Sequence, residues 1–250
     1  MFLSRRPFPQ DRSPQIAKAQ AELAVHVTRF VGRPGSSVLI FVAGMAEIVD
    51  LVDRFEALNE SAMNGTGGGG GKKVLYKIVA IHSDIPDDEQ AEAFVAAGAS
   101  VVKVVVATNA AESSITLPDV DTVICLGVHK QIEYNALSHR TMLAPLWVSK
   151  ASAVQRAGRT GRMRPGTVYR LYARELFEAK MEAFDSGEMS RQPLDAMILR
   201  LRAMLHTAVS AAQPLGEQLW REACTCVENA RLRRDFAPLP SPHEHRFGYI

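Results

Sequence analysis

Five short apolar runs rich in β-branched residues recur along this chain, and stretches of helical character separate them. The runs occupy residues 37–42, 74–81, 101–106, 122–126 and 167–172. They lack a clean alternation of apolar and polar residues, which is typical of strands that are covered on both faces. The helix-like stretches cover residues 14–30, 46–59, 87–97 and 152–162. This pattern predicts an α/β domain with a mainly parallel sheet flanked by helices.

The composition is that of a folded protein and excludes several classes. Of the 250 residues, 47% are hydrophobic and 22% are charged. No apolar run reaches the roughly 18 residues that a membrane helix needs, so we expect no membrane partner. The start of the chain also lacks a secretory signal, which predicts an intracellular protein of the cytoplasm, nucleus or mitochondrion. Three cysteines, Cys125, Cys224 and Cys226, are too few for a disulfide scaffold or a four-thiolate zinc site, and we expect no metal site in this chain.

The net charge of +2 conceals an uneven distribution. Residues 134–174 contain no Asp or Glu and carry a formal charge of +8, so the rest of the chain carries −6. A basic block in an otherwise acidic chain suggests an anionic partner such as phosphate or nucleic acid. The alternative is a solvated basic face, and charge alone does not favour either.

The glycine run in residues 64–73 invites comparison with a phosphate-binding P-loop. That motif needs Gly, four residues and then Gly-Lys-Ser/Thr. Thr66 stands where the first glycine should be, and Lys73 stands where the hydroxyl should be. A helix-like stretch precedes the run and a strand-like run follows it, which is the reverse of the P-loop context. We therefore interpret the run as a linker.

The sequence Gln155-Arg-Ala-Gly-Arg-Thr-Gly-Arg162 carries the strongest functional signal. On one continuous helix, Gln155, Arg159 and Arg162 would share a face, and the two glycines would let the backbone approach a neighbour closely. Guanidinium groups suit phosphate because they stay charged and donate paired hydrogen bonds. The segment predicts a contact with a phosphoryl group, the alternative being a basic patch for RNA or an acidic partner without catalysis.

Polar residues follow two of the apolar runs. Residues 107–116, Ala-Thr-Asn-Ala-Ala-Glu-Ser-Ser-Ile-Thr, lie directly after the third run. The carboxyl ends of parallel strands are where α/β sheets bind ligands, although such a loop can equally be a capped turn. His82 and Ser83 follow the second run, and we interpret His82 as structural. On pattern alone, Phe94 is a core residue.

Together these segments resemble the second RecA-like domain of the DEAH-box (DExH) RNA helicases. Residues 38–48 resemble motif IV of that family, residues 107–116 motif V and residues 155–162 motif VI, and residues 188–194 resemble the start of its winged-helix module. The resemblance implies a RecA-like domain of the P-loop NTPase type, without the P-loop. It also implies a division into a flank at 1–13, a RecA-like domain at 14–184 with the linker at 64–73, and a partial winged-helix segment with a Pro-rich tail at 185–250.

The resemblance also implies roles for individual residues. Gln155 would position the attacking water, and Arg159 and Arg162 would act as arginine fingers on the γ-phosphate of ATP, with Arg156, Gly158 and Gly161 as structural support. Residues that would contact ATP are Phe94 on the base, Ser114 and Thr116 on the ribose, and Asp119. Residues that would contact RNA are Gly44, Ser83, Thr108, Asn109 and Lys150. Residues 130–149 would form a β-hairpin that guides or separates strands.

The chain departs from the family pattern at several positions. Pro118 replaces the acidic residue that reaches the ribose, which makes the adjacent Asp119 the candidate substitute, and Ala43 removes a hydroxyl from motif IV. The chain contains neither Gly-x-x-x-x-Gly-Lys-Ser/Thr nor Asp-Glu-x-His. ATP and Mg²⁺ would therefore need a first RecA-like domain, and we predict that this chain alone does not hydrolyse ATP.

The sequence is compatible with two hypotheses of function. In the first, the chain is part of an ATP-dependent RNA helicase whose partners are RNA, the first RecA-like domain and an activator protein or ribonucleoprotein assembly. In the second, it is a catalytically inactive, helicase-derived scaffold that binds RNA or protein.

Overall fold

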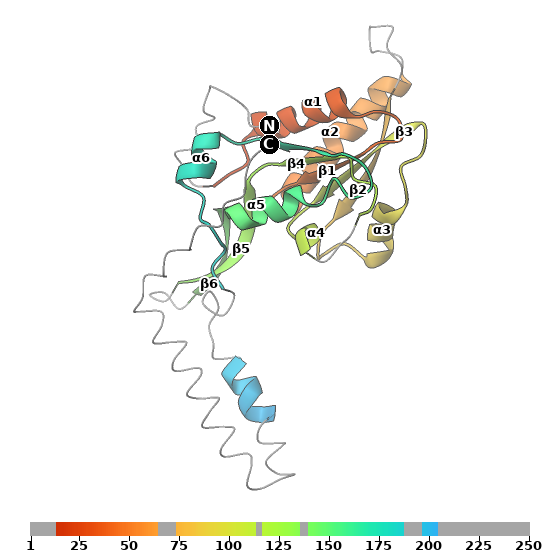
Figure 1. The fold of residues 1–250 in the computed structure, drawn as a ribbon. Helices are drawn as coiled ribbons and strands as arrows, with labels where there is room; N and C mark the ends of the chain where they lie inside the picture. The colour runs from red at the N-terminus through yellow and green to blue at the C-terminus, as the bar shows by residue number, and fades with distance from the viewer. Residues whose placement is uncertain (1–13, 65–73, 114–116, 136–139, 188–196, 205–250) are drawn as a thin grey trace. The chain divides into compact units, whose positions relative to one another are not determined.

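The computed structural model describes residues 14–64, 74–113, 117–135, 140–187 and 197–204 (Figure 1). Five strands form a parallel sheet in the order β2-β3-β1-β4-β7. Their bounds are Ser37–Phe41 (β1), Leu75–Ile81 (β2), Val101–Ala107 (β3), Thr122–Cys125 (β4) and Thr167–Arg170 (β7). Each lies within two residues of a predicted apolar run, and the predicted parallel α/β fold is confirmed.

Helices cover both faces of this sheet, as Figure 1 shows. One layer consists of α1 (Lys18–Val31) and α2 (Met45–Met63). The other contains α3 (Asp87–Ala91), the 3₁₀ turn η1 (Glu92–Phe94), α4 (Ala110–Ser113), α5 (Lys150–Ala157) and α6 (Arg174–Ala179).

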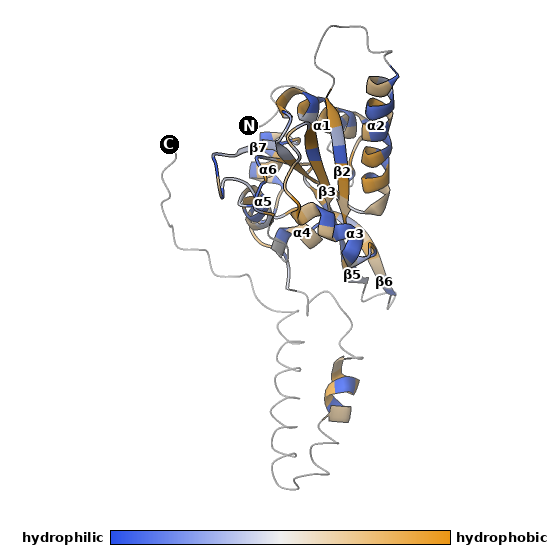
Figure 2. Cartoon of the chain, turned by 90° about the vertical axis from the view of Figure 1, so that its right-hand side faces the viewer, coloured by the Kyte–Doolittle hydropathy of each residue, from blue (hydrophilic) through white to orange (hydrophobic). Residues whose placement is uncertain are grey.

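The sheet is apolar on both sides because each side is packed against a helical layer. Alternate residues of β3 divide between two cores: Val104 packs with α1 and α2, and Val105 packs with α4 and α5. Figure 2 shows that the central strands are predominantly hydrophobic. This two-sided burial explains why the strand sequences do not alternate.

Two further strands, β5 (Val128–Asn135) and β6 (Arg140–Trp147), pair as a separate two-stranded sheet. β6 lies within the predicted hairpin at 130–149, and β5 begins two residues before it. The chain divides into two compact units, one of residues 1–132 and 143–185 and the other of residues 133–142 and 186–250. In the second unit, residues 197–204 are helical, and the motif at 188–194 lies outside the described residues. The domain bounds of the sequence analysis stay a prediction.

Two helices are shorter than the sequence predicts. The prediction of one helix over 152–162 is wrong, because α5 ends at Ala157 with Gly158 as its C-cap and Gly161 has a φ of 78°. The helix predicted over 87–97 ends as the short turn η1 at Phe94. No helix in the described part of the chain is long and apolar enough to cross a membrane.

Candidate functional site

Three neighbouring strands end at the same edge of the sheet. The register pairs Phe41 of β1 and Ile81 of β2 with Ala107 of β3, between them. The pairing continues one residue further, because the Val42 amide donates to the Ala107 carbonyl at 2.8 Å and the Thr108 amide donates to the Ile81 carbonyl at 3.3 Å. Loops that are far apart in sequence therefore begin side by side.

Four of the predicted RNA-contact residues follow these strand ends. They are Gly44 after β1, Ser83 after β2, and Thr108 and Asn109 after β3. Ser83 and Asn109 are exposed, whereas Thr108 is buried. The fifth, Lys150, lies at the start of α5, where its ammonium donates to the Glu178 carbonyl of α6 at 3.0 Å.

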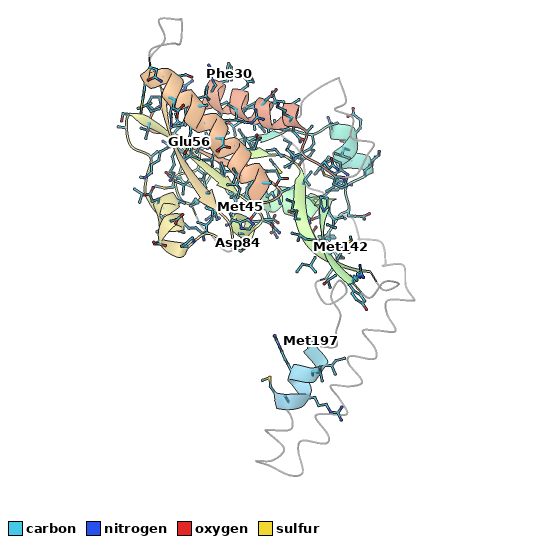
Figure 3. The ribbon with its side chains drawn as sticks, turned by 180° about the vertical axis from the view of Figure 1, so that it is seen from behind. Phe30, Met45, Glu56, Asp84, Met142 and Met197 are labelled. Carbon is cyan, nitrogen blue, oxygen red and sulfur yellow. The ribbon has the colours of Figure 1, made fainter. Side chains whose placement is uncertain are left out.

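A lysine that sequence reasoning did not single out lies across Gly44. A Cβ built at Gly44 would lie 2.8 Å from Lys130 Nζ, and that ammonium is 3.4 Å from Glu47 Oε2. Gly44 is the N-cap of the 19-residue helix α2, whose first residue Met45 is labelled in Figure 3. A cation beside the free amides of a helix N-terminus suits a phosphate. No local signal marks Lys130, because the contact joins residues 86 positions apart.

Arg156 is the largest fully buried side chain of the described structure. Its Nε donates to Glu112 Oε2 at 2.9 Å, and its guanidinium carbon lies 4.9 Å from the centre of the Phe41 ring. Nη1 lies 3.7 Å from Cys125 Sγ. Ser152 Oγ donates to the same Glu112 oxygen at 2.7 Å. The ion pair between Arg156 and Glu112 therefore joins α5 to α4, and the contacts of Arg156 with Phe41 and Cys125 join α5 to the sheet.

The backbone after α5 forms a tight loop that presents Arg159 and Arg162. Thr160 Oγ1 donates to the Val120 carbonyl at 2.8 Å, and the Arg159 guanidinium donates to the Glu112 carbonyl. A Cβ built at Gly166 would overlap Thr160 and lie 2.7 Å from the Gly161 amide. Gly161 and Gly166 thus shape this loop, and Gly158 and Gly161 do not lie inside a helix as predicted, because Gly158 is the C-cap of α5.

The two arginines are close enough to repel each other. Burial, followed by the positive charge of Arg162, lowers the pKa of Arg159. Arg162 and Gln155 are exposed and Arg159 is partly buried. The predicted common helix face does not exist, because only Gln155 lies on α5. The loop instead holds two guanidinium groups near each other, an arrangement that a polyanion would stabilise.

The residues predicted to contact ATP have different positions. Phe94 is 50% exposed, so the pattern-based interpretation as a core residue is wrong; the buried residue of that turn is Ala93. Asp119 forms an ion pair with Lys103 at 2.7 Å, and its contact with a ribose stays a prediction. Ser114 and Thr116 lie outside the described residues. In the described ranges, no cluster of three His, Cys, Asp or Glu side chains could hold a metal ion.

His129, at the start of β5, gives a pH dependence to this region. Burial, followed by the positive charge of Arg156, lowers the pKa of His129. The unfolded chain therefore binds a proton more readily, so stability is lost as pH falls below the ordinary histidine pKa of about 6.5. We expect urea unfolding to show a loss of up to about 1.4 kcal/mol per pH unit in that range. His129→Gln should reduce the slope and the exposed His26→Gln should not; equal slopes in all three proteins would contradict the assignment.

The chain is similar in sequence to a known protein family and to individual proteins. The family described as helicase conserved C-terminal domain matches residues 22–164. The chain is 40% identical over 165 residues to ATP-dependent RNA helicase dhx29 of Xenopus laevis, covering 66% of this chain and 11% of that protein. It is 34% identical over 205 residues to DExH-box ATP-dependent RNA helicase DExH1 of Arabidopsis thaliana, covering 82% of this chain and 19% of that protein.

Solved structures show the same similarity. The crystal structure of the E. coli DExH-box NTPase HrpB superposes with a TM-score of 0.61 at 26% identity, over 76% of this chain and 22% of that one. The chain thus spans a small fraction of the length of each of these proteins.

Proposed function

This chain belongs to the helicase C-terminal domain family of the DEAH-box RNA helicases, and from that premise we propose that it binds the RNA backbone and supplies arginine fingers for ATP hydrolysis. A first RecA-like domain would provide the opposite wall of the ATP site and hold Mg²⁺. The observation that carries the proposal is the loop after α5, in which the Arg159 guanidinium donates to the Glu112 carbonyl and Arg162 is close enough for its charge to lower the pKa of Arg159.

The arginine loop suits a γ-phosphate for electrostatic reasons. Guanidinium groups donate paired hydrogen bonds to phosphate oxygens and stabilise the charge that develops during transfer. Because Arg159 and Arg162 repel each other, a phosphate between them would relieve that repulsion. Gln155, exposed in the last turn of α5, would orient the attacking water. Phe94 would stack on the base, and Ser114 and Thr116 would contact the ribose.

The RNA contact is proposed for the edge where β1, β2 and β3 end. Hydroxyl, amide and backbone groups of Gly44, Ser83, Thr108 and Asn109 would hold phosphates, and contacts of this kind position RNA without reading its sequence. Lys130, beside Gly44, would add a charge to this set. Lys150 is a further proposed contact, at the start of α5.

RNA binding by this chain should depend on salt. Because phosphate contacts release counterions, we expect the Kd for a short single-stranded RNA to rise at least tenfold between about 50 and 200 mM salt. Lys130→Gln should lower the slope of log Kd against log salt by about 1. Lys77→Gln is a matched control, since Lys77 is also a partly exposed strand lysine paired with a glutamate, at 3.1 Å from Glu92. A Kd that does not change with salt would contradict the phosphate contacts.

A scaffold is the competing function. RNA binding with the expected salt slope, but no RNA-stimulated ATP hydrolysis when a first RecA-like domain is present, would favour that second function.

A further inference from the structure

Lys103 is a charged residue in the middle of an apolar strand. It lies in the Val-Val-Lys-Val-Val-Val sequence of β3, and its side chain is 1% exposed. Burying an ammonium group is costly unless acceptors surround it. The contacts of this group therefore indicate why a lysine stands there.

The Lys103 ammonium donates to two carbonyls that flank Phe94 and to one carboxylate. It donates to the Ala93 carbonyl at 2.9 Å and to the Val95 carbonyl at 2.8 Å, which flank Phe94 on either side. Its third contact is Asp119, with Oδ1 at 2.8 Å and Oδ2 at 2.7 Å. Asp119 Oδ2 also accepts from the Ala97 amide at 3.2 Å. Residues 93–97 are thus attached to the sheet through one ion pair.

Side-chain packing holds this segment only weakly. Ala93 is buried, but Phe94 is 50% exposed and Val95 is 58% exposed. The turn η1 has only three residues, and 3₁₀ hydrogen bonds have poor geometry. The hydrogen bonds from Lys103 to the two flanking carbonyls therefore hold the backbone on either side of Phe94.

We propose that Lys103 and Asp119 are positioning residues that hold Phe94 in place to stack on the base of the nucleotide. The inference rests on the proposed function for the stacking and on the described contacts for the positioning. It gives Asp119 a role through Lys103 instead of through the ribose. The ion pair also links the Phe94 turn to the arginine loop, because Val120, the residue after Asp119, accepts the hydrogen bond from Thr160.

The positioning is tested first on this chain, by hydrogen exchange of the Val95 and Ala97 amides. Lys103→Met should raise their exchange rates at least tenfold, because the Val95 carbonyl loses its donor and Asp119, which accepts from the Ala97 amide, loses its ion-pair partner. Lys77→Met is the matched control, since Lys77 pairs with Glu92 of the same turn but from the surface, and it should leave both rates unchanged. Unchanged exchange in Lys103→Met would overturn the positioning.

A second variant separates positioning from folding. Lys103→Met/Asp119→Leu replaces the charged pair by two apolar side chains, which should restore stability to urea because no buried charge is left unpaired. The amides should still exchange rapidly, because the carbonyls of Ala93 and Val95 have lost their donor. Recovery of slow exchange together with stability would overturn the proposal.

The consequence for the nucleotide is tested by steady-state ATP hydrolysis in a protein that also contains a first RecA-like domain. Phe94→Ala should raise the KM for ATP about tenfold, more than it lowers kcat, as expected for a lost stacking contact. Lys103→Met/Asp119→Leu should raise KM similarly, and adding Phe94→Ala to it should raise KM no further. Ribose triphosphate, which lacks the base, should show the same KM in every variant.

The outcomes distinguish this inference from the proposed function. Additive effects on KM, or equal effects on ATP and ribose triphosphate, would overturn the positioning role while leaving ATP hydrolysis intact. Turnover that does not depend on Arg159 would instead refute the proposed function, and the hydrogen-exchange result on this chain would still stand.

Discussion

Replacing Arg159 by alanine is expected to lower the kcat of RNA-stimulated ATP hydrolysis by about 10³-fold or more, in a protein that combines this chain with a first RecA-like domain. An arginine finger acts on charge that develops in the transition state, and its removal costs about 10³–10⁵ in rate. Arg159→Lys should restore little of the rate, because an ammonium cannot donate the planar pair of hydrogen bonds. The measurement is phosphate release under saturating RNA and ATP.

The matched control is Arg164→Ala in the same loop. Arg164 is exposed, and its guanidinium donates to both carboxylate oxygens of Asp121, with Nη2 at 2.7 Å from Oδ2. We expect less than a twofold change in kcat for this variant. Equal rates for the wild-type protein and Arg159→Ala would refute the finger. RNA-stimulated hydrolysis by the isolated chain would refute the expectation that it needs a first domain.

The second large effect is on stability. Arg156→Met is expected to lower the free energy of unfolding by about 3–5 kcal/mol, because it leaves the carboxylate of Glu112 beside an apolar core without its charged partner. That loss corresponds to a fall in Tm on the order of 10 °C for a chain of this size. Urea unfolding and thermal denaturation both measure it.

Two comparisons make the stability prediction specific. Arg164→Met removes an arginine whose side chain is 55% exposed, so its ion pair with Asp121 should contribute less than about 1 kcal/mol. Arg156→Met/Glu112→Leu removes both charges and should recover part of the lost stability. Equal losses for Arg156→Met and Arg164→Met would show that burial of Arg156 does not determine its contribution.

The positions of the strands could be predicted from the sequence, because buried parallel strands leave a local signal. The run at residues 101–106 is apolar on both faces apart from Lys103, which indicates a strand that is covered on both faces. Ser83 and Asn109 could also be placed at one edge of the sheet, because the carboxyl ends of parallel strands coincide.

The arginine loop could not be predicted, because a helical spacing of polar residues looks the same whether or not a helix continues. Gln155, Arg159 and Arg162 have the spacing of one face, but the chain leaves the helix at Gly158. The signal against a helix was the pair of glycines, each unfavourable in a helix interior. Their better explanation is the turn itself, where Gly161 adopts a positive φ that suits glycine.

The partners of the buried charged residues also could not be predicted from the sequence. Glu112 lies 44 residues before Arg156, and Lys103 lies 16 residues before Asp119. Periodicity reports which residues face a core, but it does not report which charge meets which. The valine-rich context of Lys103 was the one available signal, since an unpaired ammonium would not be stable there.

Glu112 determines how mutations in this region will divide between loss of folding and loss of activity. Its carboxylate holds Arg156 and Ser152, whereas its main-chain carbonyl accepts from Arg159. A missense change other than Glu112→Asp removes the carboxylate and keeps the carbonyl, so its first consequence is a lower abundance of folded protein. Genetic screens that score only activity would count Glu112 among catalytic residues, and a parallel measurement of protein level would separate the two classes.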